Sequence, residues 1–271
     1  MAKSKITNHK LAEDPCYAAL KFRSGGREMN SARRQWLVGF SSLGAGAILI
    51  GCNKAGTSGS NETRVEKEGE EAEVTATEDL MREHGILRRI LLVYQETATR
   101  LSGNASIPPE PLQKAAKLFR VFGEEYHEKK LEETYIFPAV KKAAGEAAGY
   151  ADVLIAQHQR GREITDFVLA VTAGPKMSTS NLKSFVAALE SMVRMYEHHA
   201  AIEDTVVFPT WKETLNSKQL DDMNEKFEEI EHQQFGEDGF EDALEQIAQI
   251  EQSLGLSDLT QFTAPAPPTA G

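Results

Sequence analysis

Apolar residues recur at steps of three and four over most of residues 77–254, with polar residues between them. This spacing is the period of an amphipathic α-helix. It predicts a helical domain over residues 77–254, with helices at about 77–102, 110–144, 150–171, 180–215 and 218–254, the last interrupted near Gly236 and Gly239. Four long helices with short connections predict an all-α, up-down-up-down four-helix bundle with an extra C-terminal helix.

Start and stop signals flank these segments. Thr75 and Glu78 have the spacing of a capping box, which predicts that the first helix begins near Thr77. Pro108-Pro109 make a turn before the second helix, and the glycines of 145–149 break the pattern before the third. Gly174-Pro175 end the third helix.

The N-terminal residues 1–51 differ in character from the rest. They carry eight Lys/Arg and three Asp/Glu, whereas the remainder carries 22 basic and 38 acidic residues. Arg33-Arg34 stand before an apolar run, Trp36 to Ile50, that is short for a membrane span and leads to Cys52. The pattern resembles a twin-arginine signal with a lipobox, which implies cleavage before Cys52 and lipidation of its thiol. The alternative is a single short membrane anchor.

This resemblance predicts an exported lipoprotein, anchored to the membrane through Cys52 and facing the periplasm or an equivalent compartment. Met29 begins a more ordinary signal than Met1 does, so we expect translation to start there. Residues 52–76 are rich in Gly, Ser, Thr and Glu and predict a flexible tether, and the Pro-rich residues 255–271 predict a disordered tail. The acidic body argues against nucleic acid or an anionic membrane surface as a partner.

A motif occurs twice in the helical domain. Glu132-Glu133 and Phe137-Pro138 recur 71 residues later as Glu203-Asp204 and Phe208-Pro209. The first copy follows His127-Glu128 and the second follows His198-His199. Because the copies lie on alternate helices of the predicted bundle, they suit a pseudo-symmetric two-metal site.

Helical phase selects the ligands of the second copy. The apolar stripe Phe185, Leu189, Met192 and Tyr196 continues at the same spacing to His199, Glu203 and Val206. His199 and Glu203 should therefore point into the core one turn apart. His198 lies about 100° away and is expected to be exposed. An ionised glutamate beside a core histidine is costly unless it is paired or bound to metal.

The first copy leaves two alternatives. Glu128 and Glu132 are one α-helical turn apart, whereas His127 and Glu132 are about 140° apart. A π-bulge would align residues five apart, and such bulges favour functional sites. Alternatively, Glu128 is the ligand and His127 lies behind it. We expect His127 and Glu132 to bind, with Glu128 as a seventh ligand.

Two more histidines lie on apolar stripes. His84 is on the first helix and His158 is on the third, with Gly161 about one turn further to allow another group a close approach. A single histidine of this kind is usually a satisfied core residue, but four on four helices with two in-phase acids predict a metal site. Imidazole and carboxylate without thiolate favour iron over manganese or zinc. The candidate ligands are His84, His127, Glu128, Glu132, His158, His199 and Glu203.

The sequence resembles the hemerythrin-like, or HHE cation-binding, family over about residues 78–215. The resemblance rests on Met81-Arg-Glu-His84, Tyr126 to Glu133, Gln157-His158, His199 to Glu203 and the two Phe-Pro pairs. It implies a four-helix bundle with an oxo- or hydroxo-bridged di-iron centre that reacts with O2, NO or peroxide. Oxygen carriers of the family have a second histidine where this chain has Arg162. This departure favours sensing, small-molecule reactivity or iron handling over oxygen storage.

Three functions stay open on the sequence alone. The first is a membrane-tethered di-iron protein that binds or reacts with a small oxygen or nitrogen species. The second is a di-iron oxidase or peroxidase, in which Tyr126, Tyr196 or Glu128 serves as the acid or base. The third is a lipoprotein whose bundle holds no metal.

Overall fold

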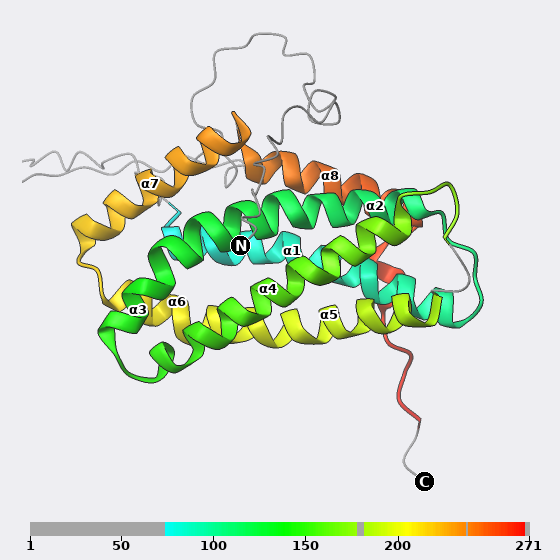
Figure 1. Cartoon of the computed structure of the whole chain (residues 1–271), viewed down its shortest axis with the longest axis horizontal. Helices are drawn as coiled ribbons and strands as arrows, with labels where there is room; N and C mark the ends of the chain where they lie inside the picture. Colours follow the sequence, from blue (N-terminus) through cyan, green and yellow to red (C-terminus); the bar gives the residue numbers. More distant parts are fainter. Residues whose placement is uncertain (1–73, 178–181, 237, 269–271) are drawn as a thin grey trace, which may run out of the picture. The chain divides into compact units, whose positions relative to one another are not determined.

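The computed structural model describes residues 74–177, 182–236 and 238–268. Every regular element among these residues is a helix, as Figure 1 shows, so the all-α fold class is confirmed for them. The export signal, the anchor at Cys52, the start at Met29 and most of the tether lie outside the described residues. Within the described part, no helix is both long enough and apolar enough to cross a membrane.

Four helical rods form the bundle. The second and fourth rods change from one helical winding to another without a break. In chain order the rods are α1 (Ala76–Ser102); α2 (Pro109–Leu118) with η3 (Phe119–Ile136) and α3 (Phe137–Ala143); α4 (Glu146–Thr172); and α5 (Leu182–Ile202) with η5 (Glu203–Val207) and α6 (Phe208–Glu213). α1 packs along α5 and touches α2 and η3, and α4 lies against α2, α3 and α5. The predicted four-helix bundle is therefore confirmed (Figure 1).

The predicted apolar stripes form the core. Leu80, Leu87 and Leu91 of α1 are at most 5 % exposed, and Phe185 and Leu189 of α5 are fully buried. Burying each such side chain contributes about 1.5–3 kcal/mol relative to leaving it in water. The stripes meet at the bundle axis, so the histidines in phase with them also face the interior.

The start of α4 differs from the prediction. The capping box of Thr75 and Glu78 at α1 is present as expected, but α4 begins at Glu146 rather than at about residue 150. Ala147 is 1 % exposed, and the burial of its side chain stabilises the extra turn of the helix. Gly149 inside that turn costs only about 1 kcal/mol relative to alanine, so it does not prevent the helix.

The extra C-terminal helix is divided as predicted. α7 (Ser217–Phe235) ends at Gly236, which has a φ of 82° that glycine adopts without strain, and α8 (Gly239–Leu254) follows. Both helices pack against α1, and α7 also contacts η3 while α8 contacts α2. Arg89 of α1 donates to Glu251 of α8 over 2.8 Å from its Nε. This pair of helices covers one side of the bundle.

The tail differs from the expected disorder in one respect. Residues Leu259–Phe262 form a short 3-10 helix, η6, whose preceding Asp258 caps the backbone N–H of Thr260 at 2.9 Å. Leu259 is 82 % exposed and Phe262 is 52 % exposed. Local capping therefore accounts for this turn better than burial does.

Candidate metal centre

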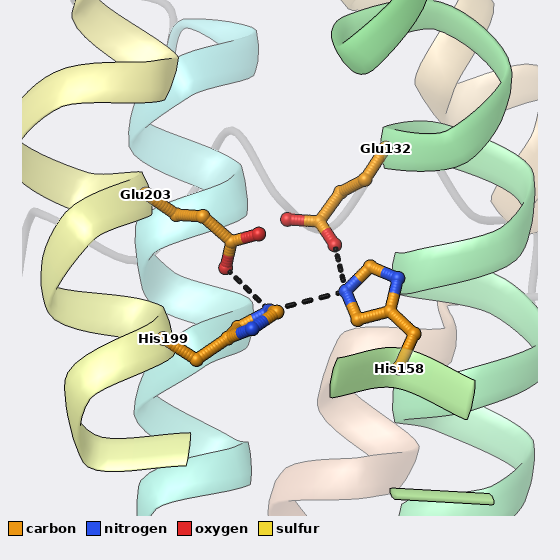
Figure 2. Close-up of side chains that lie close together, drawn as sticks. All are labelled: Glu132, His158, His199 and Glu203. Atoms are coloured by element: carbon orange, nitrogen blue, oxygen red, sulfur yellow. Dashed lines mark hydrogen bonds and ion pairs between the residues drawn. The ribbon is translucent and has the colours of Figure 1, made fainter. Parts of the chain in front are cut away.

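Six donor side chains from all four rods converge inside the bundle. Figure 2 shows four of them, with Glu132 and Glu203 facing each other above His158 and His199. All six are at most 4 % exposed. They are His84 from α1, His127 and Glu132 from η3, His158 from α4, His199 from α5 and Glu203 from η5.

Glu132 lies between two pairs of histidines. Its Oε1 is 3.3 Å from Nε2 of His127 and 4.0 Å from Nε2 of His84. Its Oε2 is 3.3 Å from Nε2 of His158. One carboxylate thus offers one oxygen to each side, which is the arrangement of a bridging ligand.

Glu203 is the second carboxylate that contacts a histidine of each pair. Its Oε2 is 3.4 Å from Nε2 of His84 and 3.0 Å from Nε2 of His199. Nε2 of His199 is in turn 3.1 Å from Nε2 of His158. We call the two resulting donor sets the His84–His127 position and the His158–His199 position, with both carboxylates shared between them.

The donor atoms fit a pair of cations. Two ligand atoms that bind one metal ion at about 2.1 Å and at right angles lie about 3 Å from each other, close to the separations here. Both oxygens of Glu132 and of Glu203, together with Nε2 of His127, are buried, and no described residue outside the donor set hydrogen-bonds to them. Carboxylates buried with only imidazoles beside them are costly unless a positive charge is present, and a bound cation would supply that charge.

π-helical winding brings His127 and Glu132 onto one side of their helix. η3 is a π-helix, and the N–H of Phe137 donates to the carbonyl of Glu132 five residues earlier. Residues five apart therefore align, as the first of the two sequence alternatives requires. η5 repeats this feature after Glu203, because the N–H of Phe208 donates to the carbonyl of Glu203.

The second π-helix also corrects one detail of the stripe. Continuing the α-helical spacing placed Val206 in the core, but Val207 is the residue that is fully buried. One extra residue in the turn after Glu203 moves the next core position along by one. Up to Glu203 the predicted phase holds, since His199 and Glu203 both face the interior.

An outer ring of acceptors orients the four imidazoles. Each of these acceptors accepts a hydrogen bond from Nδ1 of a histidine on a neighbouring rod, so that Nε2 of the histidine faces inward. The pairs are His84 with Asp204 at 2.7 Å, His127 with Glu83 at 2.7 Å, His158 with Glu133 at 2.9 Å and His199 with Gln157 at 2.9 Å. This arrangement is typical of metal-binding histidines.

The two Phe-Pro pairs support the site from the same end. Phe137 stacks on the ring of His158 with centroids 5.5 Å apart, and Phe208 stacks on His84 at 5.3 Å. Both phenylalanines are at most 1 % exposed. The repeated motif therefore supplies a carboxylate shared by the two donor sets, a hydrogen-bond acceptor and an aromatic neighbour in each half.

The buried carboxylates of the site stabilise positive charge on the groups around them. Burial lowers the pKa of His158, but the charge of Glu128 and the hydrogen-bonding carboxylates of Glu132 and Glu133 outweigh it and raise the pKa to about 10. The pKa of His127 is also raised, because its interactions with Glu132 and Glu83 overcome its burial. The interior of the bundle thus favours bound cations, whether protons on the imidazoles or metal ions between them.

The comparisons with known proteins agree with this geometry. The model of the hemerythrin HHE cation-binding domain matches residues 75–211. The chain belongs to this family. It is also 41 % identical over 232 residues to uncharacterized proteins of Mycobacterium bovis and Mycobacterium tuberculosis, which covers 85 % of this chain and 90 % of theirs. No solved structure gives a significant match.

Glu128 is buried next to the six donors and is held by two other side chains. Its Oε1 accepts a hydrogen bond from the hydroxyl of Tyr196 at 2.7 Å, and its Oε2 accepts one from Arg162 at 3.1 Å. Arg162 also donates to Glu133 at 2.7 Å. Glu128 thus lies beside the six donors, with Oε2 3.9 Å from Nδ1 of His158, and both of its oxygens are hydrogen-bonded by other side chains. Its role as a seventh ligand stays a prediction.

A small cavity adjoins the centre on the side of α1, η3 and α5. It has a volume of about 10 Å³, which is room for about one water molecule. Three of its walls are apolar: Leu87, Leu91 and Ala200. Its polar lining includes Glu128, Tyr196 and the donors His84, His127, Glu132 and His199.

The remaining histidines of the helical domain lie away from the site. His198 is exposed, as expected from its helical phase, and His232 is exposed as well. The outer acceptors Glu83, Glu133, Gln157 and Asp204 were not predicted from the sequence. A signal was available, because each of them is the chain neighbour of a predicted ligand.

Proposed function

We propose that this HHE-family bundle binds two non-haem iron ions and that the pair binds or reacts with a small oxygen or nitrogen species. The observation that carries the proposal is the convergence of four inward-facing Nε2 atoms on two shared carboxylates. Nitrogen and oxygen donors without thiolate suit iron, with manganese and zinc as weaker candidates. Glu132, Glu203 and the imidazoles of His84, His127, His158 and His199 would hold the ions.

The cavity supports the choice of a small ligand. Iron, when bound, supplies the affinity for O2, NO or peroxide, and the protein supplies the compartment. Leu87, Leu91 and Ala200 keep one side of the compartment apolar, and its size of about 10 Å³ suits a molecule of a few atoms. With Arg162 in place of a further imidazole, we infer a role in sensing, small-molecule reaction or iron handling rather than oxygen storage.

Metal analysis and spectroscopy test this function. The purified chain should take up about two iron ions per chain under anaerobic reconstitution. Its optical and Mössbauer spectra should change when O2 or NO is added. Fewer than about one iron per chain would favour the metal-free structural lipoprotein instead.

A di-iron oxidase or peroxidase is the second candidate. The hydroxyl of Tyr196 and the carboxylate of Glu128, 2.7 Å apart, both line the cavity beside the donors. A phenol next to a carboxylate can hold or pass a proton where a peroxide oxygen would bind. Steady turnover of hydrogen peroxide, reduced by substitution of Tyr196→Phe, would favour the enzyme. Binding without turnover would favour the first function.

We further propose that the bundle is exported and tethered to the membrane through Cys52. The support is in the sequence: Arg33-Arg34, the apolar run after them and the cysteine that ends it. Metabolic labelling with a fatty acid tests the anchor. Label should enter the full chain and be lost on substitution of Cys52→Ala.

A further inference from the structure

The outer ring of acceptors has one unlike member. Three imidazoles donate their Nδ1–H to carboxylates, those of Glu83, Glu133 and Asp204, whereas His199 donates to the side-chain amide of Gln157. Gln157 is half-buried on α4, one residue before His158. The difference therefore falls on only one of the two donor pairs.

A carboxylate and an amide act differently on an imidazole. A carboxylate can only accept from Nδ1–H, so it fixes the tautomer with a free Nε2 and makes that nitrogen a better donor. An amide carries both an acceptor oxygen and a donor NH2 group, so it fixes the tautomer less firmly and adds no negative charge. His199 is thus the least strongly polarised of the four histidines.

The consequence differs between the two positions. Both histidines of the His84–His127 position are backed by carboxylates, at 2.7 Å each. In the His158–His199 position only His158 has such a partner. The two positions therefore share the same carboxylates, Glu132 and Glu203, and differ in the acceptor behind one imidazole.

We propose that Gln157 is a positioning residue that makes the His158–His199 position the weaker of the two, so that it fills second and empties first. This inference rests on the proposed two-metal centre. The metal centre would then hold one ion tightly and one that exchanges, although the two halves of the site repeat the same motif. Changing the acceptor behind a metal-bound histidine typically changes metal affinity by about 10- to 100-fold.

Titration of the metal-free full chain with Co²⁺ tests the proposal. Calorimetry and the visible absorption of Co²⁺ should resolve two steps separated by at least about tenfold. Anomalous diffraction at one equivalent should place the ion between His84 and His127. Gln157→Glu should tighten only the second step, by about tenfold or more.

Glu83→Gln is the matched control. It makes the same amide-for-carboxylate exchange behind His127, so it should weaken the first step and bring the two steps together. Equal steps in the unsubstituted chain, a first ion at the His158–His199 position, or unchanged steps in Gln157→Glu would overturn the role of Gln157. Failure of the unsubstituted chain to bind any Co²⁺ would overturn the proposed metal centre itself.

Discussion

A Cβ atom on residue 161 would overlap the hydroxyl oxygen of Tyr196 and lie 2.8 Å from its ring carbon Cζ. Gly161 on α4 therefore gives the Tyr196 side chain of α5 the space in which it reaches Glu128 at 2.7 Å. The Tyr196 ring also packs edge-on against Phe119, with centroids 5.0 Å apart. A close approach near Gly161 was expected from the sequence, and Tyr196 is the group that makes it.

Gly161→Ala should displace this ring and lower stability. The ring is buried and cannot move without disturbing its neighbours, so we expect a loss of about 1–3 kcal/mol. Denaturant unfolding measures the loss. Gly149→Ala in the same helix is the control, because no atom lies within 4 Å of its added Cβ. It should be neutral or stabilise by up to about 1 kcal/mol. Equal stability of the two variants would contradict the packing argument.

Two adjacent histidines should differ sharply in their effect on metal uptake. His199 is 4 % exposed with Nε2 directed at Glu203, whereas His198 is exposed. His199→Ala should reduce iron content below about half of that in the unsubstituted chain, because it removes a donor from one position and disturbs a shared carboxylate. His198→Ala should leave iron content unchanged. Elemental analysis gives the answer, and equal losses in both variants would show that the helical phase was misread.

The sequence was sufficient for those parts of the site that depend on one regular helix. From α5 to the first residue of η5, the period of 3.6 residues continues the stripe from Phe185 to His199 and Glu203 without interruption. In η3 the backbone changes from α-helical to π-helical winding. An assumed period of 3.6 residues per turn therefore left both His127 and Glu128 as candidates for the ligand beside Glu132. The choice depends on where the π-helix lies, and local periodicity does not determine that position.

The outer acceptors depend on how neighbouring helices are aligned. Glu83 precedes His84 in the chain but supports His127 on the next rod, and Asp204 follows Glu203 but supports His84. The offset of neighbouring helices along their axes decides which residues pair in this way. The hydrophobic pattern of a single helix carries no information on that offset. The early start of α4 was missed for a related reason, because the burial of Ala147 is a tertiary contact.

Removal of metal should lower the thermal stability of the chain. A ligand that binds only the folded state at 100 times its dissociation constant adds about 2.7 kcal/mol, or roughly 5–10 °C for a chain of this size. We therefore expect chelation to lower the melting temperature of iron-loaded protein by at least that much. Differential scanning calorimetry with and without chelator measures the shift.

Glu203→Gln is the control for that shift. The amide keeps the shape of the side chain but removes the charge that both positions share, so the variant should melt at the same temperature with and without chelator. A shift of normal size in Glu203→Gln would contradict the proposed role of this carboxylate as a ligand shared by both positions. It would point to metal bound elsewhere on the acidic surface.

Glu124 should make stability depend on pH in the neutral range. Burial raises the pKa of this carboxyl from 4.5 to about 7, although Thr165 and the guanidinium groups of Arg120 and Arg162 oppose the rise while Glu128 adds to it. The native state therefore holds the proton more tightly than the unfolded state. The contribution is favourable at low pH and is lost as the pH rises from about 4.5 to 7, for a cost of up to about 3 kcal/mol.

Glu124→Gln should remove this loss, because glutamine stays neutral at every pH. Urea unfolding of the metal-free chain, with chelator present, should show the variant gaining stability relative to the unsubstituted chain between pH 5 and pH 8. Glu125→Gln is the control, since Glu125 is the exposed neighbour in the same helix and should show no such gain. Parallel pH profiles for Glu124→Gln and the unsubstituted chain would mean that the Arg120 guanidinium, whose Nε lies 2.9 Å from the carboxylate, keeps Glu124 ionised throughout.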